Sequence, residues 1–151
     1  MFSLVRRFIK TSVGFLALGL LIGGWMIVRR ELQGRFPTPY ETSAHTHALF
    51  VGFVMMMICG VALWLFPRPD KSDTAYDPAM IGASYWLITA GTAGRVAAEL
   101  ARSSIATPAL AWTVLLCSAA QVVGILLFFR TMWSRIRPVG SQAREERGER
   151  F

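Results

Sequence analysis

Four long runs of apolar residues, each about as long as a membrane-crossing helix, dominate the pattern along the chain. They cover approximately residues 8–28, 44–66, 78–100 and 107–129. A helix needs roughly 20 such residues to cross about 30 Å of hydrocarbon. None of these runs shows the strict apolar–polar alternation of a β-barrel strand. The pattern predicts an all-α integral membrane protein, a four-helix bundle that forms one domain over residues 1–151.

Residues that commonly start or stop helices stand at the boundaries of these runs. Asp77 and Thr107 each precede a proline, which is the expected order of an N-cap and a first helical residue. Ser43 is the predicted N-cap of the second run, and Pro67 ends that run because proline cannot donate the next helical hydrogen bond. Residues 134–151 are rich in Arg and Glu and lack an apolar face, so we expect a charged cytoplasmic tail.

Composition and charge support a lipid environment. The chain is 54% hydrophobic and 17% charged, whereas a soluble domain has about 45–50% apolar and about 25% charged residues. The net charge of +7 does not indicate nucleic acid, because the basic residues flank the apolar runs instead of forming one patch. Eleven Lys and Arg lie on the side of the two termini and four on the other side. The positive-inside rule therefore predicts a multi-pass protein of the inner (cytoplasmic) membrane with both termini in the cytoplasm.

The chain has only two histidines, His45 and His47, and both lie near the start of the second run. On an α-helix they point roughly 200° apart, so they cannot chelate one ion together. His45 shares its face with Gly52 and Met56, where small residues let a bulky group approach. His47 shares its face with large apolar residues suited to lipid. His45 is the better ligand candidate, and the alternative is that it is a polar residue at the membrane interface.

Arg95 is a cation inside the third apolar run, at the same predicted depth as His45. Such residues usually face a protein interior or a cofactor. An imidazole that can ligate iron and a guanidinium that can pair with propionates suggest haem. Glu99 follows Arg95 at i+4, so a structural ion pair is the alternative interpretation.

The stretch that begins His45-Thr46-His47, continues through Gly52 to Gly60 and ends Phe66-Pro67-Arg68 resembles the second transmembrane helix of haem-copper oxidase subunit I. Within that family it is similar to the cbb3-type oxidase and nitric-oxide-reductase branch. A His-Thr pair opens this helix in the family, and the histidine is an axial ligand of the low-spin haem b. The resemblance, over about 24 residues, implies that His45 ligates the iron of haem b.

The same resemblance also implies what the chain lacks. A full catalytic subunit has a second axial histidine and three more for the active-site metal, and this sequence has no histidine after His47. We therefore expect a short stand-alone relative without the catalytic metal centre, at most a haem redox subunit. Whether the chain is an enzyme stays open.

The first functional expectation is a small haem-b membrane protein that transfers electrons or binds a gas such as O2 or NO. Its cofactor-binding residues would be His45, Arg95, Gly52 and Met56, with His45 as the metal ligand. Because one chain offers one convincing ligand, a six-coordinate iron needs a homodimer or a larger respiratory membrane complex.

Two further functions follow from other features of the sequence. The chain can be a non-enzymatic accessory subunit that packs in a respiratory complex without haem, its glycines serving as helix contacts. A weaker interpretation is an ion path through Arg95, Glu99 and Gln121. A red protein with a Soret band supports haem, and a colourless protein supports packing.

Overall fold

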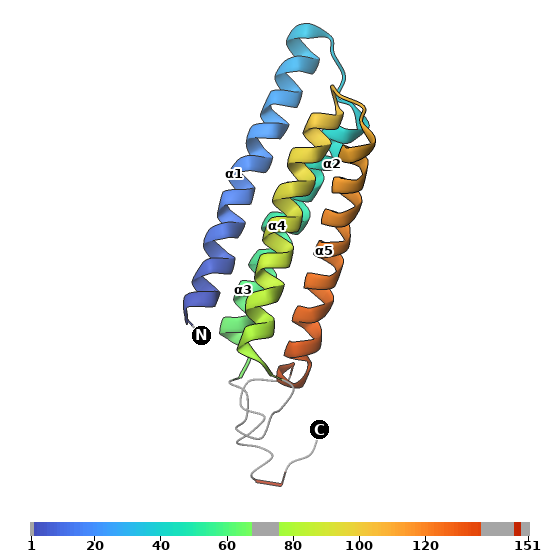
Figure 1. Ribbon diagram of the computed structural model, residues 1–151. Helices are drawn as coiled ribbons and strands as arrows, with labels where there is room; N and C mark the ends of the chain where they lie inside the picture. The colour runs from blue at the N-terminus through green and yellow to red at the C-terminus, as the bar shows by residue number, and fades with distance from the viewer. Residues whose placement is uncertain (1, 68–75, 137–146, 149–151) are drawn as a thin grey trace.

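The computed structural model describes residues 2–67, 76–136 and 147–148, which form helices and connecting segments without a β-strand. The predicted all-α class is therefore confirmed. Four long helices lie side by side (Figure 1), and the second of them is continuous across three segments. The elements are α1 (Phe2–Gln33), α2 (Pro39–His47), η1 (Ala48–Met55), α3 (Met56–Leu65), α4 (Pro78–Arg102), α5 (Pro108–Met132) and the single turn η2 (Trp133–Arg135).

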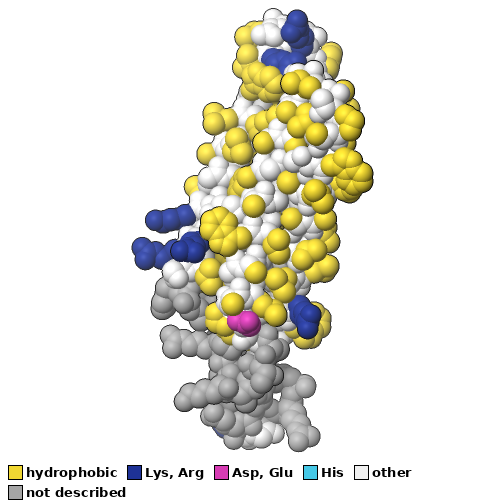
Figure 2. All heavy atoms as spheres, viewed as in Figure 1, with side chains coloured by type: hydrophobic (Ala, Val, Ile, Leu, Met, Phe, Trp, Pro, Cys, Tyr) yellow, Lys and Arg dark blue, Asp and Glu magenta, His cyan; other side chains and the backbone are white. Residues whose placement is uncertain are grey.

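Three of the long helices are long and apolar enough to cross a membrane. They occupy Ser3–Gln33, Pro39–Leu65 and Pro108–Arg135. Figure 2 shows apolar side chains along most of the visible surface, with Lys and Arg toward its two ends. Three of the four predicted spans are therefore helices of sufficient length and hydropathy to cross a membrane. The fourth, α4, has 25 residues and a length of about 37 Å, but it is too polar to meet the same criterion.

The hydropathy of α4 is lower because this helix contains more polar residues, and several of these residues are buried against neighbouring helices. Ser84 donates to the carbonyl oxygen of Gly124 at 2.7 Å, and Gln121 donates to Thr92 at 3.0 Å. A Cβ added at Gly91 would lie 2.8 Å from a backbone oxygen of α5. Small residues and hydrogen bonds between helices are typical of packing within a membrane, where hydrophobicity does not drive helices together.

The structure confirms two predicted helix starts and corrects a third. The side chains of Asp77 and Thr107 accept hydrogen bonds from the backbone of the first turns of α4 and α5. Ser43 is not an N-cap, because the second helix already begins at Pro39. Thr38 is the cap there, and with Glu41 it forms a reciprocal capping box.

The second helix widens in its middle, where η1 is π-helical. Ala44, Ala48, Gly52 and Met56 are all buried. Their interval of four exceeds the α-helical turn of 3.6 residues, and the i to i+5 hydrogen bonds of a π-helix accommodate it. The wider turn keeps one side of this helix against α1 and α4 along its length.

The chain after α5 differs at one position from the expected solvated tail. Arg135 is fully buried and donates to the carbonyl oxygens of Pro67 and Phe66 at 2.8 and 3.1 Å. These carbonyls lie at the C-terminal end of α3, where helices leave acceptors without partners. Residues 137–146 and 149–151 of the predicted tail lie outside the described residues, as do Arg68 and Lys71 of the charge count.

Candidate haem-ligand site

His45 points from α2 toward α1. Its Nδ1 lies 2.9 Å from the carbonyl oxygen of Gly19, and its ring lies above Gly23, where an added Cβ would be 2.7 Å from Cε1. The missing side chain of Gly23 therefore lets the ring approach the backbone of α1. A carbonyl can only accept a hydrogen bond, so the ring tautomer that fits this contact donates from Nδ1 and has its lone pair on Nε2.

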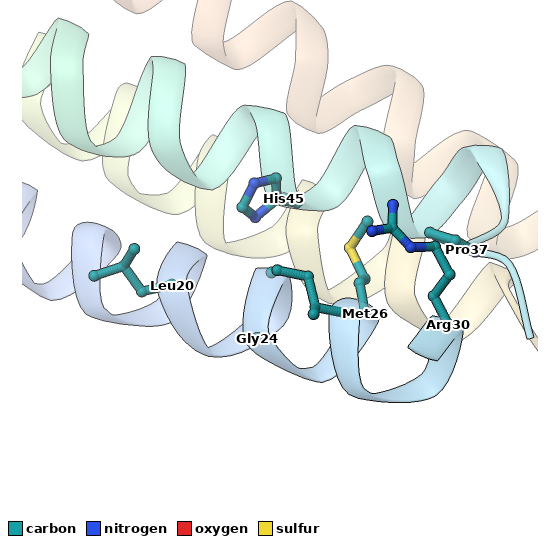
Figure 3. A pocket seen from close by; sticks show the side chains of 8 residues that line it. Leu20, Gly24, Met26, Arg30, Pro37 and His45 are labelled. Atoms are coloured by element: carbon teal, nitrogen blue, oxygen red, sulfur yellow. The ribbon is translucent and has the colours of Figure 1, made fainter. Parts of the chain in front are cut away.

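A cavity of about 430 Å³ lies beside this imidazole, between α1 and the start of α2. In Figure 3 the His45 ring lies between the two helices, with Met26 and Arg30 farther along α1 and Pro37 beside Arg30. The volume falls within the usual range of small-molecule sites, about 300–1,000 Å³. Most of the lining is apolar, and the cavity is bounded by Leu20, Gly23, Gly24, Met26, Ile27, Arg30, Pro37 and His45.

The cavity offers one metal-ligating side chain, so it suits a metal whose other ligands come from the cofactor itself. His45 offers one nitrogen whose orientation is held by a backbone carbonyl, the arrangement common in metal-binding histidines. Arg30 adds a cation at the loop end, where it also pairs with Glu31 at 2.7 Å. Among the described residues no cluster of three or more His, Cys, Asp or Glu could hold a bare metal ion. A planar macrocycle with acidic substituents is chemically consistent with these features.

The other two residues predicted to share the His45 face lie farther along the helix. Gly52 packs on Phe15, because a Cβ there would be 2.5 Å from the Phe15 ring. Met56 is fully buried, and its sulfur accepts a weak hydrogen bond from Thr89 at 3.8 Å. Neither residue lines the cavity beside His45.

Arg95 lies level with the start of the second helix but on its other side. Its Nε donates to Oε1 of Glu99 at 2.9 Å, and the same oxygen accepts a hydrogen bond from Ser43 at 2.8 Å. The side chain of Glu99 is 3% exposed and that of Arg95 is 20% exposed. Arg95 is absent from the lining of the His45 cavity. The structure therefore brings Arg95 to Glu99 and separates it from His45.

His47 faces this second cluster and not the lipid stripe expected from the sequence. Both of its ring nitrogens are buried and have no hydrogen-bond partner in the described ranges. The charges of Arg95 and Glu99 act on the ring, and Oε2 of Glu99 is also buried without a partner within the described part of the chain. The residues that follow at helical spacing do face outward, since Phe50 is 64% exposed.

Local sequence patterns indicated only some of the contacts made by these two groups. The i, i+4 spacing of Arg95 and Glu99 indicated their ion pair. Ser43 contacts Glu99 across 56 positions, and no local pattern identifies such a pair. Gln121, predicted with Arg95 and Glu99 in an ion path, bonds to Thr92 instead.

Comparison of the chain with protein-family models, with curated proteins and with solved structures finds no match.

Proposed function

We propose that this chain is a multi-pass membrane protein that binds haem b through His45 and uses it to transfer electrons or to bind a gas such as O2 or NO. The observation that carries this proposal is the His45 imidazole. Its Nδ1 is engaged by the Gly19 carbonyl and its ring borders a cavity of about 430 Å³. The resemblance of residues 45–68 to a haem-ligand helix of oxidase subunit I is the reason for proposing haem b as the bound cofactor.

Different residues of the cavity would contact different parts of such a cofactor. His45 would hold the haem iron through Nε2, since Nδ1 is already engaged by Gly19. Arg30 would face the propionates at the loop end of the cavity. Apolar residues such as Leu20 and Met26 would exclude water from the ring. Bound haem supplies a one-electron redox couple, or an open iron position for a gas ligand.

A two-fold homodimer would complete the coordination of the iron. The wall of the cavity on α1 contains Leu20 and Ile27, which are 60% and 57% exposed. A second copy that covers this wall would bring its own His45 to the same cofactor, and closed two-fold symmetry is the commonest arrangement. The expected ratio is one haem per two chains. A measured ratio of one haem per chain contradicts the shared site.

Removal of each histidine in turn tests the ligand. We expect His45→Ala to abolish the Soret band of the purified protein titrated with haemin, and His47→Ala to retain most of it. His47 is a matched control, because it has the same chemistry two positions away and faces α4. Loss of the band in His47→Ala alone contradicts the assignment of His45.

We also propose that α4 crosses the bilayer, so that the four long helices form a bundle with both termini in the cytoplasm. The eleven-to-four distribution of Lys and Arg supports this orientation. Ser84 and Glu99 of α4 are buried and form hydrogen bonds with α5 and α2, so these side chains would not face lipid. Reporter fusions after Arg35 and Ser104 should read as external, and one at the C-terminus as cytoplasmic. A cytoplasmic reading after Ser104 contradicts the crossing by α4.

The second candidate function is a haem-free accessory subunit of a respiratory membrane complex. Two observations favour it: the charge of Arg95 is already balanced by Glu99, and the space at Gly52 is filled by Phe15. In that case the purified wild-type protein stays colourless after haemin is added. Replacement of His45 would then change neither absorption nor complex assembly.

A further inference from the structure

A second cavity, of about 350 Å³, lies at the N-terminal end of α1, away from His45. Three of the residues that line it are cations, three carry a hydroxyl group, and none is acidic. The cations are exposed and take part in no ion pair within the described ranges. The lining residues are Ser3, Arg6, Arg7, Lys10, Thr11 and Tyr85. A cavity lined by three cations and no acidic residue favours the binding of an anion.

The floor of this cavity contains a pair of hydroxyl groups from two helices. Thr11 Oγ1 on α1 and Tyr85 OH on α4 lie 2.9 Å apart. Each hydroxyl has one proton, and the bond between them uses one of the two. Whichever atom donates, the other keeps a proton for a further acceptor. Because Tyr85 is 7% exposed, its ring is held in place by packing, so the pair forms a fixed donor beneath the cations.

The position of the cavity along α1 matches the depth of lipid headgroups. Lys10 lies near the beginning of the apolar run of this helix. The neighbour of Tyr85, Trp86, is 60% exposed, and Trp and Tyr are enriched at the membrane interface. Basic pockets between transmembrane helices at this depth are suited to anionic headgroups.

The surface next to the cavity continues as an apolar track toward the membrane centre. At helical spacing from Lys10 come Gly14, Leu18 and Leu21. A Cβ at Gly14 would meet nothing within 4 Å, and the two leucines are 36% and 72% exposed. A free phosphate ion would make no contact with this apolar surface, whereas the acyl chain of a lipid can lie along it.

We propose that this cavity binds the phosphate of an anionic phospholipid. Arg6, Arg7 and Lys10 pair with the phosphate, the hydroxyl pair of Thr11 and Tyr85 donates one hydrogen bond to it, and an acyl chain follows the exposed side of α1. This assignment is independent of the haem site, because the two cavities share no residue.

The alternative is that the three cations only orient α1 through the positive-inside rule. Orientation depends on charge and not on hydroxyl groups. The double variant Thr11→Val with Tyr85→Phe keeps every charge and most of the packing while it removes both donors. It therefore separates a built site from a topological signal.

Native mass spectrometry of the full chain in detergent, with defined lipids added, tests the proposal. Wild type should retain phosphatidylglycerol at least about tenfold better than phosphatidylcholine. Replacement of Arg6, Arg7 and Lys10 by Gln should lower retention of phosphatidylglycerol by about tenfold or more. The hydroxyl double variant should lower it by about threefold to tenfold.

The control removes three positive charges elsewhere, by the changes Arg35→Gln, Arg102→Gln and Arg130→Gln. It should retain phosphatidylglycerol as wild type does. Equal loss in this control, or an unchanged hydroxyl double variant, overturns the site. Inorganic phosphate at millimolar concentration should not displace the lipid. If phosphate displaces it, or binds while the lipid does not, the assignment to a phospholipid is overturned.

Discussion

Ser43 and Glu99 connect the start of the second helix to the end of α4, since Ser43 Oγ donates to Glu99 Oε1 across 2.8 Å. The same oxygen accepts from Arg95 at 2.9 Å, so one carboxylate oxygen serves two donors from two helices. With His47 beside them, these residues form a polar cluster between the second helix and α4. A buried cluster of charges is costly unless the charges are paired.

Glu99→Gln should destabilise the protein because it leaves the Arg95 guanidinium without its counter-charge. Loss of one partner of a buried ion pair costs about 3–5 kcal/mol, and the partial exposure of Arg95 places the expected cost near the lower value. The measurement is the unfolding free energy or thermal midpoint in detergent.

Two controls accompany the Glu99 variant. Glu31→Gln removes the exposed partner of Arg30 and should cost less than about 1 kcal/mol. A double variant with Arg95→Leu and Glu99→Gln should recover part of the lost stability. If the double variant is less stable than Glu99→Gln alone, the ion pair is not the main role of Glu99.

Gly23→Ala should weaken haem binding, because the new Cβ would lie 2.7 Å from His45 Cε1 and would push the ring from the Gly19 carbonyl. We expect haem affinity to fall by about tenfold, equal to about 1.4 kcal/mol. Gly82→Ala in α4 is the control, since nothing lies within 4 Å of its Cβ and Gly82 does not line the cavity. Haemin titration followed at the Soret band compares the two. Equal affinities for the two variants contradict the placement of the His45 ring.

Arg135→Gln should destabilise the end of the molecule where α3 and α5 terminate. The buried guanidinium donates to carbonyls at the end of α3, and hydrogen bonds from charged groups contribute about 1.5–3 kcal/mol each. A loss of about 2–3 kcal/mol in unfolding free energy is expected. The exposed Arg130 provides the control, since Arg130→Gln should change stability by less than about 0.5 kcal/mol.

Local sequence signals predicted the helices and most of their boundaries. Asp77 and Thr107 were identifiable as caps because an N-cap and the following proline are adjacent in sequence. The true cap of the second helix was equally readable, since Thr38 and Glu41 have capping-box spacing. The position of Ser43 directly before the apolar run predicts a cap there, but its hydroxyl instead binds a residue 56 positions away.

The directions of side chains were harder to predict than the helices. A uniform α-helical period places His47 on the lipid side, but its nitrogens are buried. The widened turn of η1 interrupts that period immediately after His47. The apolar sequence of η1 contains no residue that predicts a π-helix. Arg135 lies in a stretch of charges that resembles a solvated tail, and only the fold brings it to the carbonyl of Pro67.

The midpoint potential of bound haem should depend on Arg30 and not on Arg95. Removal of a positive charge near the propionates favours the oxidised, more positive iron and lowers the potential. Arg30 lines the cavity beside His45, although it is half exposed, so screening limits the effect. Arg30→Gln should lower the midpoint by about 20–40 mV, or roughly 0.5–1 kcal/mol for one electron. Arg95→Leu should reduce stability, because it leaves Glu99 without its ion-pair partner, and it should leave the potential of the retained haem unchanged, because Arg95 does not line the cavity beside His45. Redox titration of both variants separates these roles. A lower potential in Arg95→Leu with wild-type potential in Arg30→Gln would assign the propionate contact to Arg95.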